Sequence, residues 1–308
     1  MLSLLLLLSQ AAAEFAATPP PLFQAVRRLD PSAAIAMIES GADPNLRDDH
    51  GRTILQAVAT SFGRERERLI RLLLTKGADP NARDAMGASA VDDAVWMGSA
   101  ERTMLLLDAG GKINEPEAKT GATPLNEAAF QGHIDVAKLL LARGADVRTK
   151  DYAGYSPIEN ALRQRQLDMV QLLLPLYHDR ELPNHLLEEA IRRGQDDAVG
   201  MLLKEGASIN ARSPLGSTPL YDAALKGDAE IVSDLVSRGA DIDARDVNSG
   251  TTPLYAAAAF GRKQVVAILL LWGADPNALS KEGISPLHAA ESNQYSDIAQ
   301  QIRKAGGH

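Results

Sequence analysis

A short phrase, Gly-Ala-Asp followed by Pro or a β-branched residue, recurs along this chain at a nearly constant interval. It begins at Gly41, Gly77, Gly144, Gly206, Gly239 and Gly273, with weaker copies at Gly111 and Gly306. Neighbouring copies are 33 to 36 residues apart, except that Gly144 and Gly206 are 62 apart, which fits two units with one shortened. A fixed period of this length indicates stacked structural repeats rather than one compact core.

A second phrase, Thr or Ser followed by Pro and Leu or Ile, keeps step with the first, as in Thr123-Pro124-Leu125. A Thr or Ser accepts hydrogen bonds from free amides at a helix start, and Pro is tolerated in the first turn. Glycines such as Gly132 and Gly227 end a helix because they adopt positive φ at little cost. Runs such as Leu139 to Leu141 supply the buried face of a second helix. Each unit is therefore predicted to be a helix–turn–helix followed by a projecting loop.

The two phrases in register resemble the ankyrin repeat, which has a period of about 33 residues and the motif Thr-Pro-Leu-His-x-Ala. The chain is also similar to exported bacterial members of that family. The resemblance implies an all-α ankyrin-repeat solenoid of about nine helix–turn–helix units with projecting β-turn loops. The expected repeats, of which the first and last are capping units, are 21–47, 48–83, 84–117, 118–150, 151–180, 181–212, 213–246, 247–279 and 280–308.

Three departures from this pattern carry expectations of their own. Only His288 occupies the family's His position, and its replacement elsewhere, for instance by Gln56 or Asn126, predicts weaker coupling between repeats. Residues 60–68 lengthen the turn of the second repeat. The unit after Asp179 is short and lacks the Thr-Pro-Leu phrase, so a bend or soft joint is predicted near residues 175–184.

The N-terminus differs from the repeats. Residues 1–13 read as an apolar run followed by small residues, which is typical of a secretory signal peptide cleaved near Ala13, and residues 14–20 read as a linker. We therefore expect export to a periplasm or secretion; a cytoplasmic protein with an apolar tail is the alternative. The run is too short to cross a bilayer and no other stretch is apolar enough, so no integral membrane span is expected.

Composition narrows the chemistry. The chain has no cysteine, which excludes disulfides and thiolate chemistry, and its net charge of -8 disfavours nucleic acid as a partner. It has neither a phosphate-binding loop nor a Gly-x-Ser-x-Gly elbow, and its six histidines show no zinc-binding spacing. Asp43, Asp79 and Asp146 lie in the repeated turn, where Asp is expected to bond the backbone. We expect no catalytic residue, cofactor or metal.

The family geometry implies a concave binding face made by the ends of the first helices and the loop tips. An apolar patch of Trp96, Met97 and Phe130 is expected there, followed by a basic stripe of Arg163, Arg192, Arg193 and Lys226. Aromatic residues and Arg dominate interface energies, although each of these side chains could instead pack internally or face solvent. The complete set of predicted protein-binding residues is Trp96, Met97, Phe130, Gln131, Tyr152, Tyr155, Arg163, Arg192, Arg193, Lys226 and Phe260.

These residues predict a monomeric, non-catalytic scaffold that holds or inhibits another protein, one with an acidic surface opposite the basic stripe. Two alternatives stay open: a host-directed secreted effector, and an accessory or targeting subunit of an enzyme.

Overall fold

The computed structural model describes residues 21–61 and 65–308, which fall into two compact units divided between Leu173 and Leu174. The predicted signal peptide and linker, residues 1–20, lie outside the described residues, as do residues 62–64 of the lengthened turn. Within the described ranges the regular elements are eighteen α-helices and one 3-10 helix, in nine consecutive helix pairs. The all-α solenoid expected from the repeats is confirmed.

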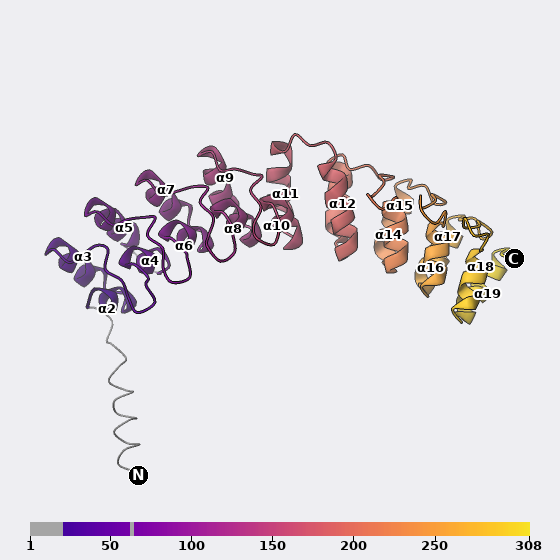
Figure 1. Ribbon diagram of the computed structural model, residues 1–308, viewed down its shortest axis with the longest axis horizontal. Helices are drawn as coiled ribbons and strands as arrows, with labels where there is room; N and C mark the ends of the chain where they lie inside the picture. The colour runs from indigo at the N-terminus through magenta and orange to yellow at the C-terminus, as the bar shows by residue number, and fades with distance from the viewer. Residues whose placement is uncertain (1–20, 62–64) are drawn as a thin grey trace, which may run out of the picture. The chain divides into compact units, whose positions relative to one another are not determined.

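Unit 1 contains five helix pairs. The first helices of successive repeats lie side by side in one row and the second helices in another (Figure 1). Its helices are α2 (Pro21–Arg27), α3 (Pro31–Glu39), α4 (Ile54–Ala59), α5 (Arg66–Thr75), α6 (Ala90–Trp96), α7 (Ala100–Asp108), α8 (Pro124–Gln131), α9 (Ile134–Ala142), α10 (Pro157–Arg163) and α11 (Leu167–Leu173).

Unit 2 contains four pairs. Its α12 has twelve residues and begins at Leu182 without a side-chain cap, because the Thr-Pro-Leu phrase is missing there. Its elements are the 3-10 helix η1 (Leu174–Leu176) and helices α12 (Leu182–Arg193), α13 (Asp196–Lys204), α14 (Pro219–Lys226), α15 (Ala229–Ser237), α16 (Pro253–Ala259), α17 (Lys263–Leu271), α18 (Pro286–Ser292) and α19 (Ser296–Lys304). The soft joint at residues 175–184 stays a prediction.

The repeated phrases define the helix ends by the expected chemistry. At α8, the Thr123 hydroxyl accepts from the Asn126 amide at 3.3 Å, and the Asn126 side-chain oxygen accepts from the Thr123 amide at 3.1 Å. This reciprocal capping satisfies two amides that have no partner within the helix. Gly132 ends the helix with φ of 77°, a conformation that a residue with a Cβ adopts only at a cost.

The core of each unit lies between its two helical rows. Leu73, Leu106 and Leu140, from the second helices of unit 1, are completely buried, and so is the small pair Ala128 and Ala129 in the first helix α8. Burying one leucine contributes roughly 1.5–3 kcal/mol. Alanines in the first helices allow close packing, so stability comes mainly from contacts between neighbouring repeats.

The projecting loops are joined by side-chain bridges. Asn45 donates from its Nδ2 to the Gly77 carbonyl and accepts from the Asp79 amide, both at 2.9 Å. Asp43 accepts from the Asn45 amide at 2.9 Å, and Asp79 and Asp146 make the same turn in their own repeats. The expected structural role of these aspartates is confirmed.

The predicted weakening at the substituted His positions is wrong for three of them, and at one of these Tyr221 Oη lies 3.1 Å from Thr251 Oγ1 of the next repeat. Gln56 donates from its Nε2 to the Ala88 carbonyl of the next repeat at 2.9 Å. Asn126 donates to the carbonyls of Thr149 and Tyr155, each at 3.2 Å. A side-chain amide offers both a donor and an acceptor, so it can cap its own helix and still bond the next repeat.

Candidate functional site

The predicted apolar patch lies at the ends of two neighbouring first helices. Trp96 is seven residues after the capping Ser89 and Phe130 is seven after the capping Thr123, so both occupy one register of the repeat. Their side chains are 57% and 41% exposed, whereas Met97 is half-buried. Helices α6 and α8 pack against each other. The exposed part of this patch therefore consists of the Trp96 and Phe130 side chains.

A hydrogen bond from the next repeat fixes the backbone beneath Trp96. The imidazole Nε2 of His133, the residue before α9, lies 3.1 Å from the Trp96 carbonyl oxygen. Gly98 lies against the same ring, where an added Cβ would come within 2.8 Å of it. Trp96 is thus held on a rigid helix end, which lowers the entropy lost when its ring contacts a partner.

A groove of about 300 Å³ opens beside Trp96, between α6, α8 and the loop that connects repeats three and four. Its walls contain four carboxylates and no Lys or Arg. The lining residues are Ala88, Asp92, Asp93, Trp96, Glu117, Thr120, Ala122 and Glu127. Trp96 and the two alanines add apolar lining to these carboxylates.

The carboxylates of this groove were missed by sequence reasoning, although a signal was present. Asp93 and Glu127 stand four residues after the capping Ser or Thr, where other repeats of this chain have Ala57, Ala256 and Ala289. Three repeats show that the fold accepts alanine at this register. Acidic residues occupy this register in three repeats, as Asp93, Glu127 and Asp222, and the signal is that the first two stand in consecutive repeats.

Burial raises the pKa of Asp93 to about 7, a rise that Asp84 and Asp92 increase and the Arg52 guanidinium partly offsets. Arg52 Nη2 lies 3.8 Å from Asp93 Oδ2, too far for a hydrogen bond. That oxygen is buried and, among the described residues, accepts no hydrogen bond. Burial also raises the pKa of Asp92, against two bonds from Ser89.

The other predicted binding residues of unit 1, at the loop tips, on α10 and at the end of α8, make contacts within the chain. The guanidinium carbon of Arg163 lies 3.7 Å from the centre of the Tyr155 ring, a cation–π contact. Tyr152 is an exposed loop-tip residue whose ring covers Gly121 of the preceding loop. Gln131 donates to Glu127 at 2.9 Å. Arg163, Tyr155 and Gln131 are therefore partly occupied by contacts within the chain.

The remaining basic residues belong to unit 2, and each has a partner there. Arg192 and Arg193 both form ion pairs with Glu189 on the same helix. Lys226 donates to the Ile191 carbonyl at 3.1 Å and lies 3.7 Å from Asp228. Phe260 is exposed at the end of α16. Glu189 and Asp228 thus offset part of the positive charge of Arg192, Arg193 and Lys226.

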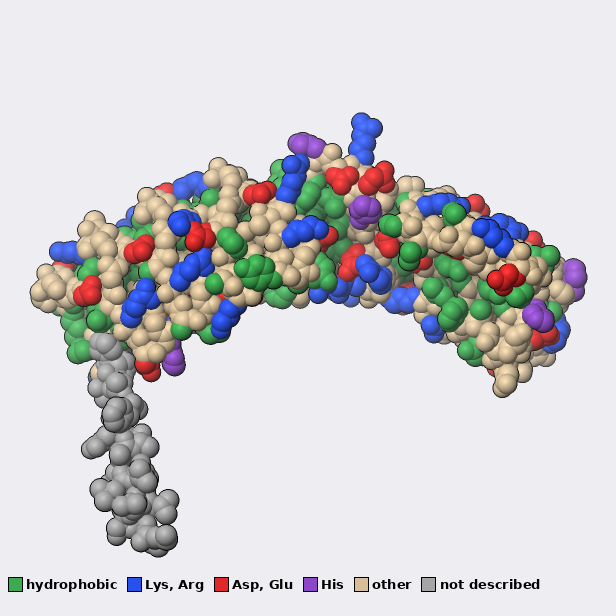
Figure 2. Space-filling model, viewed as in Figure 1, with side chains coloured by type: hydrophobic (Ala, Val, Ile, Leu, Met, Phe, Trp, Pro, Cys, Tyr) green, Lys and Arg blue, Asp and Glu red, His purple; other side chains and the backbone are tan. Residues whose placement is uncertain are grey.

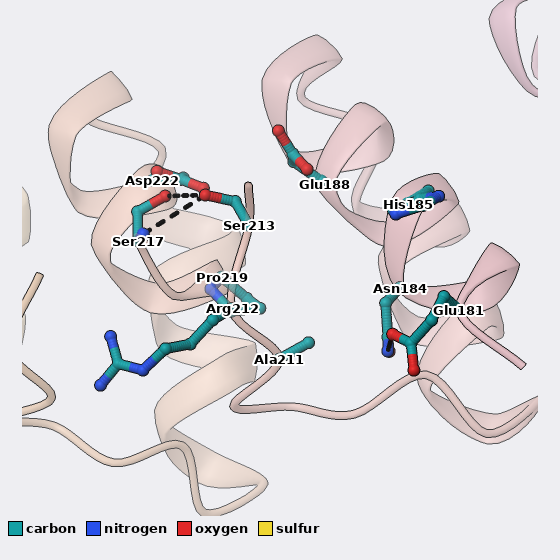
Figure 3. Close-up of a pocket in the computed structure, with 10 residues that line it drawn as sticks. All are labelled: Glu181, Asn184, His185, Glu188, Ala211, Arg212, Ser213, Ser217, Pro219 and Asp222. Carbon is teal, nitrogen blue, oxygen red and sulfur yellow. Dashed lines mark hydrogen bonds between the residues drawn. The ribbon is translucent and has the colours of Figure 1, made fainter. Parts of the chain in front are cut away.

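A smaller hollow, of about 30 Å³, lies between α12 and α14 in unit 2. Figure 3 shows Ser213, Ser217 and Asp222 together on one side and His185 on α12 on the other. Ser217 Oγ lies 2.8 Å from Ser213 Oγ, and burial raises the pKa of Asp222 to about 6. A serine nucleophile needs a base such as His within hydrogen-bond reach. Here Ser217 bonds Ser213 and the Asp222 carboxylate, while His185 lies on the other side of the hollow. The volume suits a single water molecule.

Metal-binding clusters and membrane-spanning helices are both absent from the described residues. No cluster of three or more His, Asp or Glu side chains in residues 21–61 and 65–308 could hold a metal ion. No helix in these ranges is long and apolar enough to cross a membrane. In Figure 2, side chains of both charges are interspersed over each unit. The groove beside Trp96, in contrast, brings four carboxylates together beside an exposed ring.

Comparison with known proteins agrees with the fold. Residues 22–117, 102–184 and 187–280 match the family described as ankyrin repeats (3 copies). The mouse B-cell lymphoma 3 protein homolog is 31% identical over 203 residues, which are 65% of this chain and 44% of that protein. Protein phosphatase 1 regulatory subunit 12A of mouse is 33% identical over 107 residues, 33% of this chain and 10% of that protein.

Both mouse relatives are much longer than the matched segment, so the chain spans less than half of each. An ankyrin repeat protein of fowlpox virus is 35% identical over 131 residues, which are 41% of this chain and 91% of that protein. The family match extends over most of the described residues and agrees with the paired helices, the capped helix starts and the bridged loops. This chain therefore belongs to the ankyrin-repeat family.

Proposed function

We propose that this chain is a non-catalytic scaffold that binds one partner protein and thereby holds or inhibits it. The observation that carries this is the exposed pair Trp96 and Phe130, placed at one register of two packed first helices. An exposed aromatic pair on a rigid surface is the kind of feature that anchors protein interfaces, where Trp is a preferred hot-spot residue.

The basic residues of unit 2 have a secondary role in this proposal. Arg192, Arg193 and Lys226 are exposed and could contact an acidic partner surface, but their pairing with Glu189 and Asp228 limits the charge they offer. Exposed ion pairs contribute about 0–1 kcal/mol each, whereas truncating a hot-spot Trp costs about 2–4 kcal/mol. The aromatic pair, more than the basic residues, is expected to determine affinity.

The proposal includes a location. The signal-peptide pattern at residues 1–13 supports export, to a periplasm or to the medium. Mass-spectrometric detection of a mature N-terminus near residue 14 in an exported fraction would support this. Full-length chain in the cytosol would contradict it and leave the binding proposal intact.

A role as an accessory or targeting subunit of an enzyme is a second candidate. One relative, protein phosphatase 1 regulatory subunit 12A, is named as a regulatory subunit, and the match covers 107 residues of this chain. This candidate differs in its outcome: the captured partner would be an enzyme whose activity or location changes on binding.

The test is crosslinking capture from the native source with the Trp96→Ala, Phe130→Ala double variant. We expect loss of the captured partner with unchanged helical content by circular dichroism. The matched control is Leu271→Ala, Trp272→Ala, which removes a more exposed apolar pair, 84% and 51% exposed, at the end of α17, the second helix of its repeat. Equal capture by the Trp96 double variant and the native chain would refute the proposal.

A further inference from the structure

The residues that line the groove beside Trp96 favour a bound group of positive charge and planar shape. Four carboxylates line it, no cationic side chain does, and the ring of Trp96 forms one wall. An anionic group placed there would be repelled by these carboxylates, although Arg52 lies 3.8 Å from Asp93 and offsets part of their charge. A cation would be attracted both by the carboxylates and by the face of the indole ring.

We propose that this groove binds the guanidinium group of an arginine that the partner protein presents on a basic segment; this inference rests on the proposed function. Charge complementarity supports it, because four carboxylates and no Lys or Arg line the groove, and the nearby Arg52 pairs with Asp93 alone among them. The partner that the Trp96 and Phe130 surface anchors is thus basic where it meets unit 1.

Glu127 has acceptor capacity left for such a group. It accepts one hydrogen bond, from Gln131 at 2.9 Å, and a carboxylate has about four acceptor positions, so it can receive further N–H donors. Asp93 Oδ2 is buried and lies 3.8 Å from Arg52 Nη2, so Asp93 acts on the groove through its charge. A guanidinium entering the groove would donate to Glu127 and reduce the repulsion among the carboxylates.

The other two carboxylates, Asp92 and Glu117, make hydrogen bonds that stabilise the elements around the groove. Asp92 accepts from the amide and the hydroxyl of Ser89, each at 2.8 Å, and so caps α6. Glu117 accepts from the Thr120 amide at 3.0 Å and so shapes the connecting loop. Asp93 and Glu127 are therefore the residues to change, because their replacement leaves these two structural bonds in place.

Arginine fits this groove better than lysine for a geometric reason. Its guanidinium is planar, stacks on aromatic rings, and donates in a fork that matches a carboxylate. The groove places carboxylates beside an exposed indole ring, so one planar group can use both. A lysine ammonium has no flat face to lay on the ring and is more strongly hydrated.

The experiment is a fluorescence titration of the full chain carrying Trp272→Phe, in which Trp96 is the remaining tryptophan. The probes are the peptide acetyl-Gly-Ser-Arg-Ser-Gly-amide and its citrulline counterpart, which keeps the shape and loses the charge, at constant ionic strength and at about pH 8.5. We expect the arginine peptide to saturate the Trp96 signal and to bind at least about tenfold more tightly than the citrulline peptide.

Variants of the lining residues test whether the arginine peptide binds in the groove. Glu127→Gln and Asp93→Asn are each expected to weaken the arginine peptide by about tenfold. Glu39→Gln, which removes the same charge from an exposed position at the end of α3, should leave binding unchanged. Equal binding of both peptides, or no effect of Glu127→Gln, would overturn the groove assignment. If the peptides fail while the Trp96→Ala, Phe130→Ala variant still loses its partner, the proposed function stands without this groove.

Discussion

Replacing Asp93 by Asn tests the electrostatics of the groove through stability alone. Burial is the largest cause that raises the Asp93 pKa from 3.8 to about 7, so the folded chain binds more protons than the unfolded chain between those pH values. Stability therefore falls as pH rises through this window and levels off above about 7. The charged carboxylate destabilises the fold at alkaline pH, and an uncharged Asn does not.

The magnitude follows from that pKa. A rise of about three pH units corresponds to at most about 4 kcal/mol of differential stability. The attraction to Arg52, 3.8 Å away, is already contained in that pKa, and the part of the rise that lies between about pH 5 and pH 7 corresponds to about 2–3 kcal/mol. We expect Asp93→Asn to be about 2 kcal/mol more stable than the native chain at about pH 8.5, and nearly equal to it at about pH 5.

The assay is urea unfolding followed by Trp96 fluorescence in the Trp272→Phe background, which reports the repeat that contains Asp93. Glu39→Gln serves as the control for a simple change of net charge, because Glu39 is exposed and remote from the groove. If the difference between the Asn variant and the native chain were the same at both pH values, the assignment of a buried, protonatable Asp93 would be wrong.

Three further predictions concern the fold. Gln56→Ala removes the 2.9 Å bond to the Ala88 carbonyl and the reciprocal cap of α4, and should lower the free energy of unfolding by about 1–3 kcal/mol in urea titrations. Leu140→Ala, at a completely buried position, should cost about 2–5 kcal/mol, whereas Leu141→Ala, at a half-buried position, should cost clearly less. Gly121→Ala should lower the melting temperature, because φ is 68° there and the added Cβ would collide with the Tyr152 ring; an unchanged melting temperature would contradict this.

The fold was predictable because the same sequence pattern recurs along the chain with small variations. The capping Thr or Ser, the buried leucines and the helix-ending glycines each specify a helix boundary or a buried face, and the repeats agree with one another. The bonds between repeats were harder to predict. Gln56 and Asn126 replace the family His, yet their side-chain amides bond the carbonyls of Ala88 and Tyr155 in the next repeat, because an amide combines a donor with an acceptor.

The surface was predicted only in part. Exposure of Trp96 and Phe130 follows from their register, which sequence alone supplies. The pairing of Arg192 and Arg193 with Glu189 depends on side-chain conformations that spacing leaves open. The acidic groove is assembled from α6, α8 and a loop, and a pattern read one repeat at a time does not show which side chains meet across that boundary.

The register of Asp93 connects stability with binding. Ala57, Ala256 and Ala289 occupy the same register in other repeats of this chain, so the fold does not require a carboxylate there. A buried carboxylate with a raised pKa is a cost to the free chain at neutral pH and above. A cation brought into the groove by a partner would remove that cost, because opposite charge favours the ionised form. Binding of the arginine peptide should therefore strengthen as pH rises through about 7 in the native chain, and should lose that pH dependence in Asp93→Asn. If the affinity of the native chain for the peptide did not change with pH, the charge of Asp93 would not contribute to binding.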